Sequence, residues 1–137
     1  MEKNVSLHEL ELAATQFMKR LNIGDVIYME GDLGAGKTTF VRAAIQSVAG
    51  IGEVVPSPTF TLVQTYDTHP PIWHYDLYRL TDPQEILELG IEEAFSQGVT
   101  FIEWPQRMGD LYKGRHYSII LNSSNQADHR LLTIVSP

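Results

Sequence analysis

The stretch EGDLGAGKTTF, residues 30–40, decides the fold. The template G-x-x-x-x-G-K-[ST] of a phosphate-binding loop is matched here by Gly31, Gly36, Lys37 and Thr38. Phosphate oxygens need several backbone N–H donors that converge on one point, and a loop poor in side chains that enters a helix N-terminus can supply them. The stretch therefore predicts a site for the phosphates of a nucleotide.

The residues around this loop support the same interpretation. Residues 26–29 form a short β-prone run before it, and residues 39–45 continue with the apolar spacing of a helix. Lys37 would bring positive charge to the β- and γ-phosphates, and the Thr38 hydroxyl would ligate the Mg²⁺ that bridges them. The residues expected to contact the nucleotide are Gly31, Asp32, Leu33, Gly34, Ala35, Gly36, Lys37, Thr38 and Thr39.

Composition limits the other classes of function. The 137 residues are 43% hydrophobic and 20% charged, as in one globular domain, and contain no cysteine for disulfides, thiolate catalysis or cysteine-ligated zinc. No apolar run approaches the roughly 18 residues of a membrane span, and no signal-peptide pattern opens the chain, so a cytoplasmic location is expected. The net charge of −7 argues against the domain gripping nucleic acid by itself. The five histidines show no metal-ligand spacing on a helix and are expected at surface or strand positions.

Helix signals recur along the chain. We expect helices over residues 7–21, from the loop to about residue 49, over residues 83–89 and over residues 91–96. Capping signals precede two of them. Ser6 and Glu9 form a capping box, and Asp82 with Pro83 gives an N-cap followed by proline at the first helical position.

Strand signals alternate with these helices. Strands are predicted over residues 26–29, 60–66, 72–76, 99–102, 117–121 and 131–135. The link at residues 67–71 is too short for a parallel crossover and predicts an antiparallel pair, and the polar turn at residues 122–125 predicts a C-terminal hairpin. The sequence thus predicts a single α/β domain over residues 1–137, of the P-loop NTPase type, with three layers and a mixed parallel and antiparallel sheet.

Two carboxylates at strand ends are candidates for the chemistry. A P-loop ATPase needs a second carboxylate at the end of a buried strand, beside the P-loop threonine, to hold Mg²⁺. We assign Mg²⁺ coordination to Thr38 and Glu103, and a more distal catalytic role, such as orienting the attacking water, to Asp76. The alternatives are a solvated strand-end charge for Glu103 and a cap or turn former for Asp76.

Other candidates lie in the loops. Prolines hold the segment around Thr59 extended, and the Thr59 hydroxyl could contact the γ-phosphate or Mg²⁺, or simply form a local turn. Arg79 and Arg107 could neutralise phosphate charge or be ordinary surface residues. Trp104 could pack in the core or in a loop, or it could cover the site.

With these residues in view, the sequence resembles the TsaE (YjeE) family, bacterial P-loop ATPases required for the threonylcarbamoyladenosine modification of tRNA. The resemblance rests on four segments in the family's order: GDLGAGKTTF, SPTFTLVQTY, HYDLYRL with DPQEILELG, and IEWPQR. It implies Mg²⁺-dependent hydrolysis of ATP, with Thr38 and Glu103 on the metal. Lys37, Thr59 and Asp76 are then the expected catalytic residues, with Thr59 in a switch-like segment.

The resemblance also implies partners. Family members act with TsaD, usually in its complex with TsaB, so ATP hydrolysis would drive or reset that transferase complex, and tRNA would be contacted only through it. The chain after Arg107 matches the family only as a hairpin-like shape and carries no partner contact over. Two other functions stay open: a small-molecule kinase, and a nucleotide-dependent binding module with negligible turnover.

Overall fold

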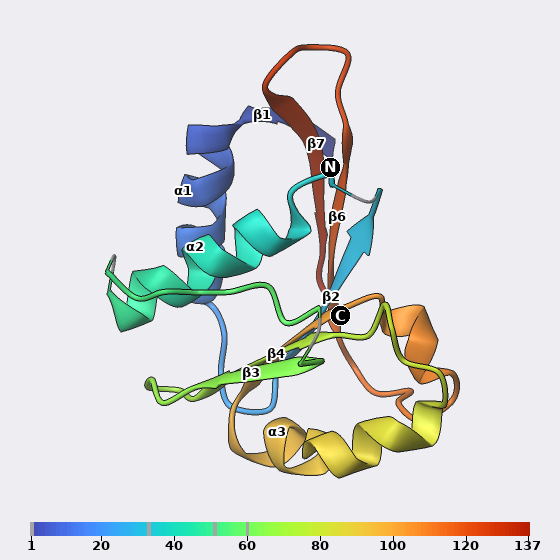
Figure 1. Ribbon diagram of the computed structural model, residues 1–137. Helices are drawn as coiled ribbons and strands as arrows, with labels where there is room; N and C mark the ends of the chain where they lie inside the picture. Colours follow the sequence, from blue (N-terminus) through green and yellow to red (C-terminus); the bar gives the residue numbers. More distant parts are fainter. Residues whose placement is uncertain (1, 33, 51, 60) are drawn as a thin grey trace.

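The computed structural model describes residues 2–32, 34–50, 52–59 and 61–137. Its strands are β1 (Glu2–Ser6), β2 (Val26–Gly31), β3 (Val63–Tyr66), β4 (Ile72–Asp76), β5 (Val99–Glu103), β6 (Tyr117–Ser123) and β7 (His129–Val135). Its helices are α1 (Leu7–Met18), α2 (Lys37–Ala49) and α3 (Ile91–Gln97), with 3₁₀ helices η1 (Pro83–Leu89) and η2 (Pro105–Met108). Helices α1 and α2 cover one face of the sheet and α3 lies on the other (Figure 1).

The seven strands form one mixed sheet in the order β1-β7-β6-β2-β5-β4-β3. Strands β6, β2, β5 and β4 run parallel, and β3 and β7 pair antiparallel with β4 and β6. This arrangement confirms the predicted α/β class, both predicted hairpins and the mixed sheet. Parallel strands present their carboxyl ends at one edge, where ligands bind in open α/β sheets. Gly31, Asp76 and Glu103 therefore all lie at that edge.

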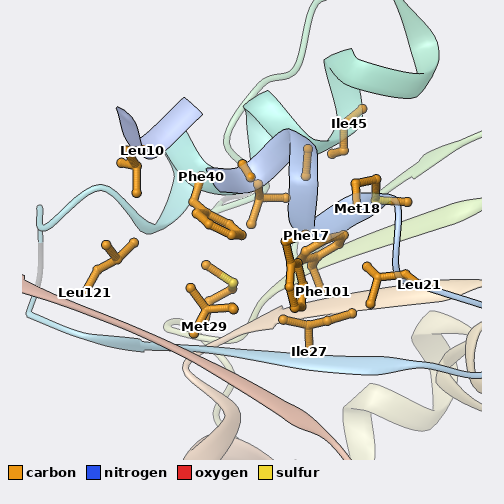
Figure 2. Close-up of a cluster of buried hydrophobic side chains, with 14 of the residues drawn as sticks. Leu10, Phe17, Met18, Leu21, Ile27, Met29, Phe40, Ile45, Phe101 and Leu121 are labelled. Carbon is orange, nitrogen blue, oxygen red and sulfur yellow. The ribbon is translucent and has the colours of Figure 1, made fainter. Parts of the chain in front are cut away.

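Two hydrophobic cores, one on each face, hold the central strands. Successive side chains of a strand point to opposite faces, so Ile27 and Met29 face α1 and α2, whereas Val26 faces η1 and α3. Figure 2 shows Phe17 and Phe40 of the two helices packed over Ile27 and Met29. Burial on both faces explains why the parallel strands read as continuous apolar runs.

Strand β1 has no counterpart among the predicted strands. Its sequence EKNVS lacks the alternation of a half-buried strand, and only Val5 is buried. The strand forms because it pairs antiparallel with β7, from Glu2 opposite Thr133 to Ser6 opposite His129. Pairing between the two ends of the chain, and not local preference, makes this edge.

Several predicted boundaries are wrong by two or three residues, including the end of β2 at Gly31 and the start of β7 at His129. Helix α1 ends at Met18 instead of residue 21. Strand β6 continues to Ser123, so the hairpin turn predicted at residues 122–125 lies beyond it, before β7. Strand β3 begins only at Val63, after Leu62 turns the backbone with a φ of 68°. The residue at which that strand is predicted to begin, Phe60, lies outside the described residues.

The first glycine of the loop motif is required by strand packing. Gly31 has a φ of 125° and lies opposite Leu121 of β6. A Cβ atom on Gly31 would lie 1.8 Å from the carbonyl oxygen of Leu121, and a backbone atom inside a sheet cannot move aside cheaply. The close approach of β2 and β6 therefore excludes any side chain at the point where the chain enters the loop.

We predict that Gly31→Ala lowers the free energy of unfolding by at least about 3 kcal/mol, because backbone strain and a steric collision add. Gly50→Ala is the matched control. Gly50 has a similar φ of 107°, but an added Cβ would meet no atom within 4 Å, so this variant measures the backbone cost alone. Urea unfolding of both variants makes the comparison, and equal losses would show that the collision with Leu121 is relieved without cost.

Candidate nucleotide-binding site

A cleft of about 250 Å³ opens at the carboxyl edge of the sheet. Its lining comes from the loop, from the start of α2, from the segment before β3 and from the ends of β4 and β5. The lining residues are Gly34, Gly36, Lys37, Thr38, Thr39, Ser57, Thr59, Asp76, Glu103 and Trp104. The fold thus brings together most of the residues singled out in the sequence, although they are spread from Gly34 to Trp104.

Three residues expected to contact the nucleotide, Gly31, Asp32 and Ala35, do not line the cleft and instead hold the loop in position. The Asp32 N–H donates to the carbonyl of Leu121 at 3.2 Å, and the Ala35 N–H donates to the carbonyl of Asp32 at 3.1 Å. Together with Gly31, these residues tie the loop to β6 and close a turn. Leu33, the remaining loop residue, lies outside the described residues.

The geometry of the loop suits an anion. Gly34 and Gly36 have φ values of 77° and 98°, a backbone conformation that favours glycine. Gly36 is also the N-cap of α2, and it places no side chain over the helix end. The first N–H groups of a helix lack intrahelical partners and carry its positive dipole end, so this helix start can bind phosphate oxygens.

Lys37 is a buried cation beside these N–H groups, with only 5% of its surface exposed. Its Nζ donates to the carbonyl of Gly31 at 3.2 Å and lies 4.0 Å from the centre of the Trp104 ring. Burial lowers the pKa of Lys37 below its usual value, and the nearby carboxylates of Glu103, Asp76 and Asp32 offset that shift only in part. Burial therefore disfavours the charge of the Lys37 ammonium, and additional negative charge beside it would stabilise that charge.

Thr38 and Glu103 form an oxygen pair in the lining of the cleft. The Thr38 hydroxyl lies 3.2 Å from Oε1 and 3.1 Å from Oε2 of Glu103, which is 3% exposed. Strand register explains the meeting, because Glu103 is opposite Met29 of β2 on one side and Asp76 of β4 on the other.

This oxygen pair fits Mg²⁺. The described residues contain no group of three His, Cys, Asp or Glu side chains that could hold a metal alone. Mg²⁺ typically keeps several waters and binds through one or two carboxylates together with substrate phosphates. A hydroxyl and a carboxylate beside an anion-binding loop therefore supply the protein's share of such a site.

Asp76 lies beside Glu103 on the neighbouring strand and contacts Thr59. The Thr59 hydroxyl donates to Oδ2 of Asp76 at 2.9 Å, and the Tyr78 N–H donates to Oδ1 at 3.0 Å. Asp76 is 5% exposed. Asp76 therefore stabilises the turn after β4, as one interpretation of the sequence expects, and it also lines the cleft, while its catalytic role stays a prediction.

His74 contacts Glu103, whereas the sequence predicts for this histidine only a surface or strand position. Its Nε2 lies 2.6 Å from Oε2 of Glu103, and the imidazole is fully buried. The signal that could have revealed it is the period of the strand: His74 and Asp76 share one face of β4, and Glu103 is opposite Asp76.

Trp104 packs against the hydrophobic core on the η1 and α3 face of the sheet and also lines the cleft. Its backbone has a φ of 59°, and its ring lies against Lys37 and, 4.9 Å away, against Tyr78. Arg107 lies with its guanidinium 5.8 Å from the centre of the Tyr78 ring. Arg107 and Arg79 are exposed, and neither lines the cleft.

Two further hollows lie near α1. One of about 270 Å³ adjoins the cleft across Gly34, Gly36 and Thr39, and it is also lined by Leu7 and Leu10. The other, of about 500 Å³ between α1 and strands β1 and β7, holds none of the candidate site residues. Among the described residues, no helix combines the length and the apolar character needed to cross a membrane.

Comparisons with known proteins agree with this geometry. The family model for "Threonylcarbamoyl adenosine biosynthesis protein TsaE" matches residues 5–132. The tRNA threonylcarbamoyladenosine biosynthesis protein TsaE of Rickettsia bellii is 46% identical over 102 residues, which are 74% of this chain and 71% of that protein. The protein of the same name from Rickettsia felis is 46% identical over 99 residues, which are 72% of this chain and 58% of that protein. The chain thus spans less than two thirds of the second relative.

A solved structure has the same architecture. The crystal structure of Bacillus subtilis YdiB superposes with a TM-score of 0.81 at 30% sequence identity. The superposition covers 99% of this chain and 84% of that chain. The agreement extends beyond the loop and α2 to the whole sheet.

We predict that Lys37→Met raises the thermal midpoint of the nucleotide-free protein by a few degrees, because it removes a cation that burial disfavours. The same variant should bind an ATP analogue at least about tenfold more weakly, since a charge-assisted contact of about 1.5–3 kcal/mol is lost. Thermal unfolding and calorimetry measure the two effects. Lys19→Met is the control, because Lys19 is an exposed lysine at the end of α1.

The stability gained by Lys37→Met should depend on pH with a definite sign. A lysine with a lowered pKa binds fewer protons in the folded state than in the unfolded state, so the wild-type protein gains stability as pH rises toward the usual pKa of 10.5. The stability advantage of Lys37→Met should therefore shrink as pH rises toward that value. An advantage that grows with pH would contradict the lowered pKa.

Proposed function

The chain belongs to the TsaE family of tRNA threonylcarbamoyladenosine biosynthesis, and we propose that within this process it is the Mg²⁺-dependent ATPase that drives or resets the TsaD–TsaB transferase complex. One observation carries the proposal. The hydroxyl of the P-loop residue Thr38 contacts the carboxylate of Glu103 in a cleft that is also lined by Lys37 and Asp76. This set of groups can hold a metal and a triphosphate and can act on water.

Binding would use both sides of the loop. The phosphates would lie at the start of α2, with Lys37 beside the β- and γ-phosphates. The hollow lined by Leu7 and Leu10 adjoins the loop on its other side and has space for the nucleobase. Thr38 and Glu103 would hold Mg²⁺, which when bound neutralises charge on the β- and γ-phosphates.

Hydrolysis would depend on Asp76 and Thr59. The Asp76 carboxylate is fixed at one oxygen by the N–H of Tyr78, so its other oxygen keeps a defined position in the cleft. Oδ2 of Asp76 accepts a hydrogen bond from the Thr59 hydroxyl. Once Thr59 turns toward the γ-phosphate, Oδ2 would be able to orient a water. Thr59 would then report the presence of the γ-phosphate to the segment before β3.

The family supplies the rest of the proposal. The relatives' names assign them to tRNA threonylcarbamoyladenosine biosynthesis. We infer that this chain acts in the cytoplasm with TsaD and TsaB and meets tRNA only through them, consistent with its net charge of −7. Energy from ATP would then be used on a protein complex.

We predict that the purified protein releases phosphate slowly from ATP in the presence of Mg²⁺, and that TsaD together with TsaB accelerates the release. A phosphate-release assay with and without these two proteins makes the measurement. A rate that the partners leave unchanged would count against the proposal. Transfer of the γ-phosphate to a small metabolite without any protein partner would instead identify a kinase.

Two substitutions should separate hydrolysis from metal binding. Asp76→Asn should lower the hydrolysis rate by about 100-fold or more, as expected for loss of acid–base assistance, with ATP affinity within about threefold. Glu103→Gln should weaken the Mg²⁺-dependent part of ATP affinity. Glu92→Gln removes the same charge from an exposed position on α3 and is the control. The assignment is reversed if Asp76→Asn abolishes Mg²⁺-dependent affinity and Glu103→Gln does not.

A further inference from the structure

We propose that His74 is the positioning residue of the metal site: its imidazole holds the Glu103 carboxylate in the orientation in which it can receive Mg²⁺. This role rests on the proposed Mg²⁺–ATP function. The imidazole lies on β4, and the carboxylate ends the neighbouring strand β5. The loop motif predicts no contact between these two side chains.

The contact between His74 and Glu103 is short and buried away from water. His74 Nε2 lies 2.6 Å from Glu103 Oε2, with exposed fractions of 0% for His74 and 3% for Glu103. Both residues sit on paired strands whose register places Asp76 opposite Glu103 and His74 two residues before Asp76. A hydrogen bond is stronger away from water, and here both backbones are fixed by the sheet. The imidazole therefore restricts the rotation of the carboxylate.

The other ring nitrogen shows which tautomer makes this contact. Nδ1 of His74 is buried and has no hydrogen-bond partner within the part of the chain that the structure describes. A proton on Nδ1 would be a buried donor without an acceptor, whereas a proton on Nε2 is donated directly to Glu103. The geometry therefore assigns the proton to Nε2.

The two oxygens of Glu103 consequently differ. Oε2 lies within hydrogen-bond distance of both His74 and Thr38, whereas Oε1 has a hydrogen-bond partner only in Thr38 among the described residues. The Thr38 hydroxyl would be one of the groups that hold Mg²⁺. His74 would remain as the contact that keeps Oε2 of Glu103 in place, so that Oε1 is available for metal binding.

Calorimetry with a non-hydrolysable ATP analogue, with and without Mg²⁺, tests the role. His74→Leu keeps a buried apolar volume and removes the donor, so the gain in affinity from Mg²⁺ should fall about tenfold or more, with Mg²⁺-free affinity within about threefold. His74→Gln carries an amide N–H that can replace Nε2–H, and it should restore the gain to within about threefold. A merely structural role would not produce this rescue.

Thr100→Val is the matched control. Thr100 is also fully buried, on β5, and its hydroxyl has no partner among the described residues. The change alters a buried polar group on the same strand as Glu103 without touching the carboxylate, so the gain from Mg²⁺ should equal that of the wild type. Equal losses in Thr100→Val and His74→Leu would overturn the proposal.

The tautomer of His74 can be measured in the wild-type protein, where no folding defect can obscure it, and a variant then tests the partner. A long-range ¹H–¹⁵N NMR spectrum of the histidine side chains should show His74 protonated at Nε2, and Glu103→Gln should shift that resonance. Protonation at Nδ1, or a resonance that Glu103→Gln leaves unchanged, would refute the contact.

Failure of this inference and failure of the proposed function are distinguishable. A Mg²⁺-dependent gain in the wild type that survives in His74→Leu would refute the positioning role alone. A wild-type protein without any such gain would refute the proposed function and this role together.

Discussion

The parallel pairing of β2, β5 and β4 is the constraint on which the whole candidate site depends. It places Glu103 between Met29 and Asp76, and it brings the carboxyl ends of the three strands to one edge. Successive residues of a strand face opposite sides, so a slip of one residue would turn Asp76 and Glu103 away from the loop. The cores on the two faces prevent such a slip, because each face of the central strands is packed against its own helices.

Polar side chains buried at this edge oppose stability and serve binding. Lys37, His74, Asp76 and Glu103 are almost fully buried, and a buried charge is costly unless it is paired. Here the groups are paired with one another or with nearby hydroxyls and backbone, which reduces that cost. The same exclusion of water strengthens every electrostatic interaction in the cleft. The site therefore concentrates its destabilising groups where they interact most strongly.

The sequence predicts well what local patterns determine. The P-loop, the capped helices, both hairpins and the carboxylates Asp76 and Glu103 at strand ends can all be read from short stretches. Strand β1 could not be predicted, because it exists only through pairing with β7 at the far end of the chain. The contact of His74 with Glu103 and the position of Trp104 over Lys37 also depend on neighbouring strands and on one backbone turn, which no short stretch encodes.

The hydrogen bonds of the cleft have a consequence for the thermodynamics of occupancy. Lys37 donates to Gly31, Thr38 to Glu103 and Thr59 to Asp76, so three donors of the cleft have internal acceptors. A nucleotide bound there would replace these bonds with bonds to itself, so the three side chains would add little net hydrogen-bond energy to its affinity. The N–H groups at the start of α2, which lack intrahelical partners, would then supply most of the net gain in hydrogen bonding.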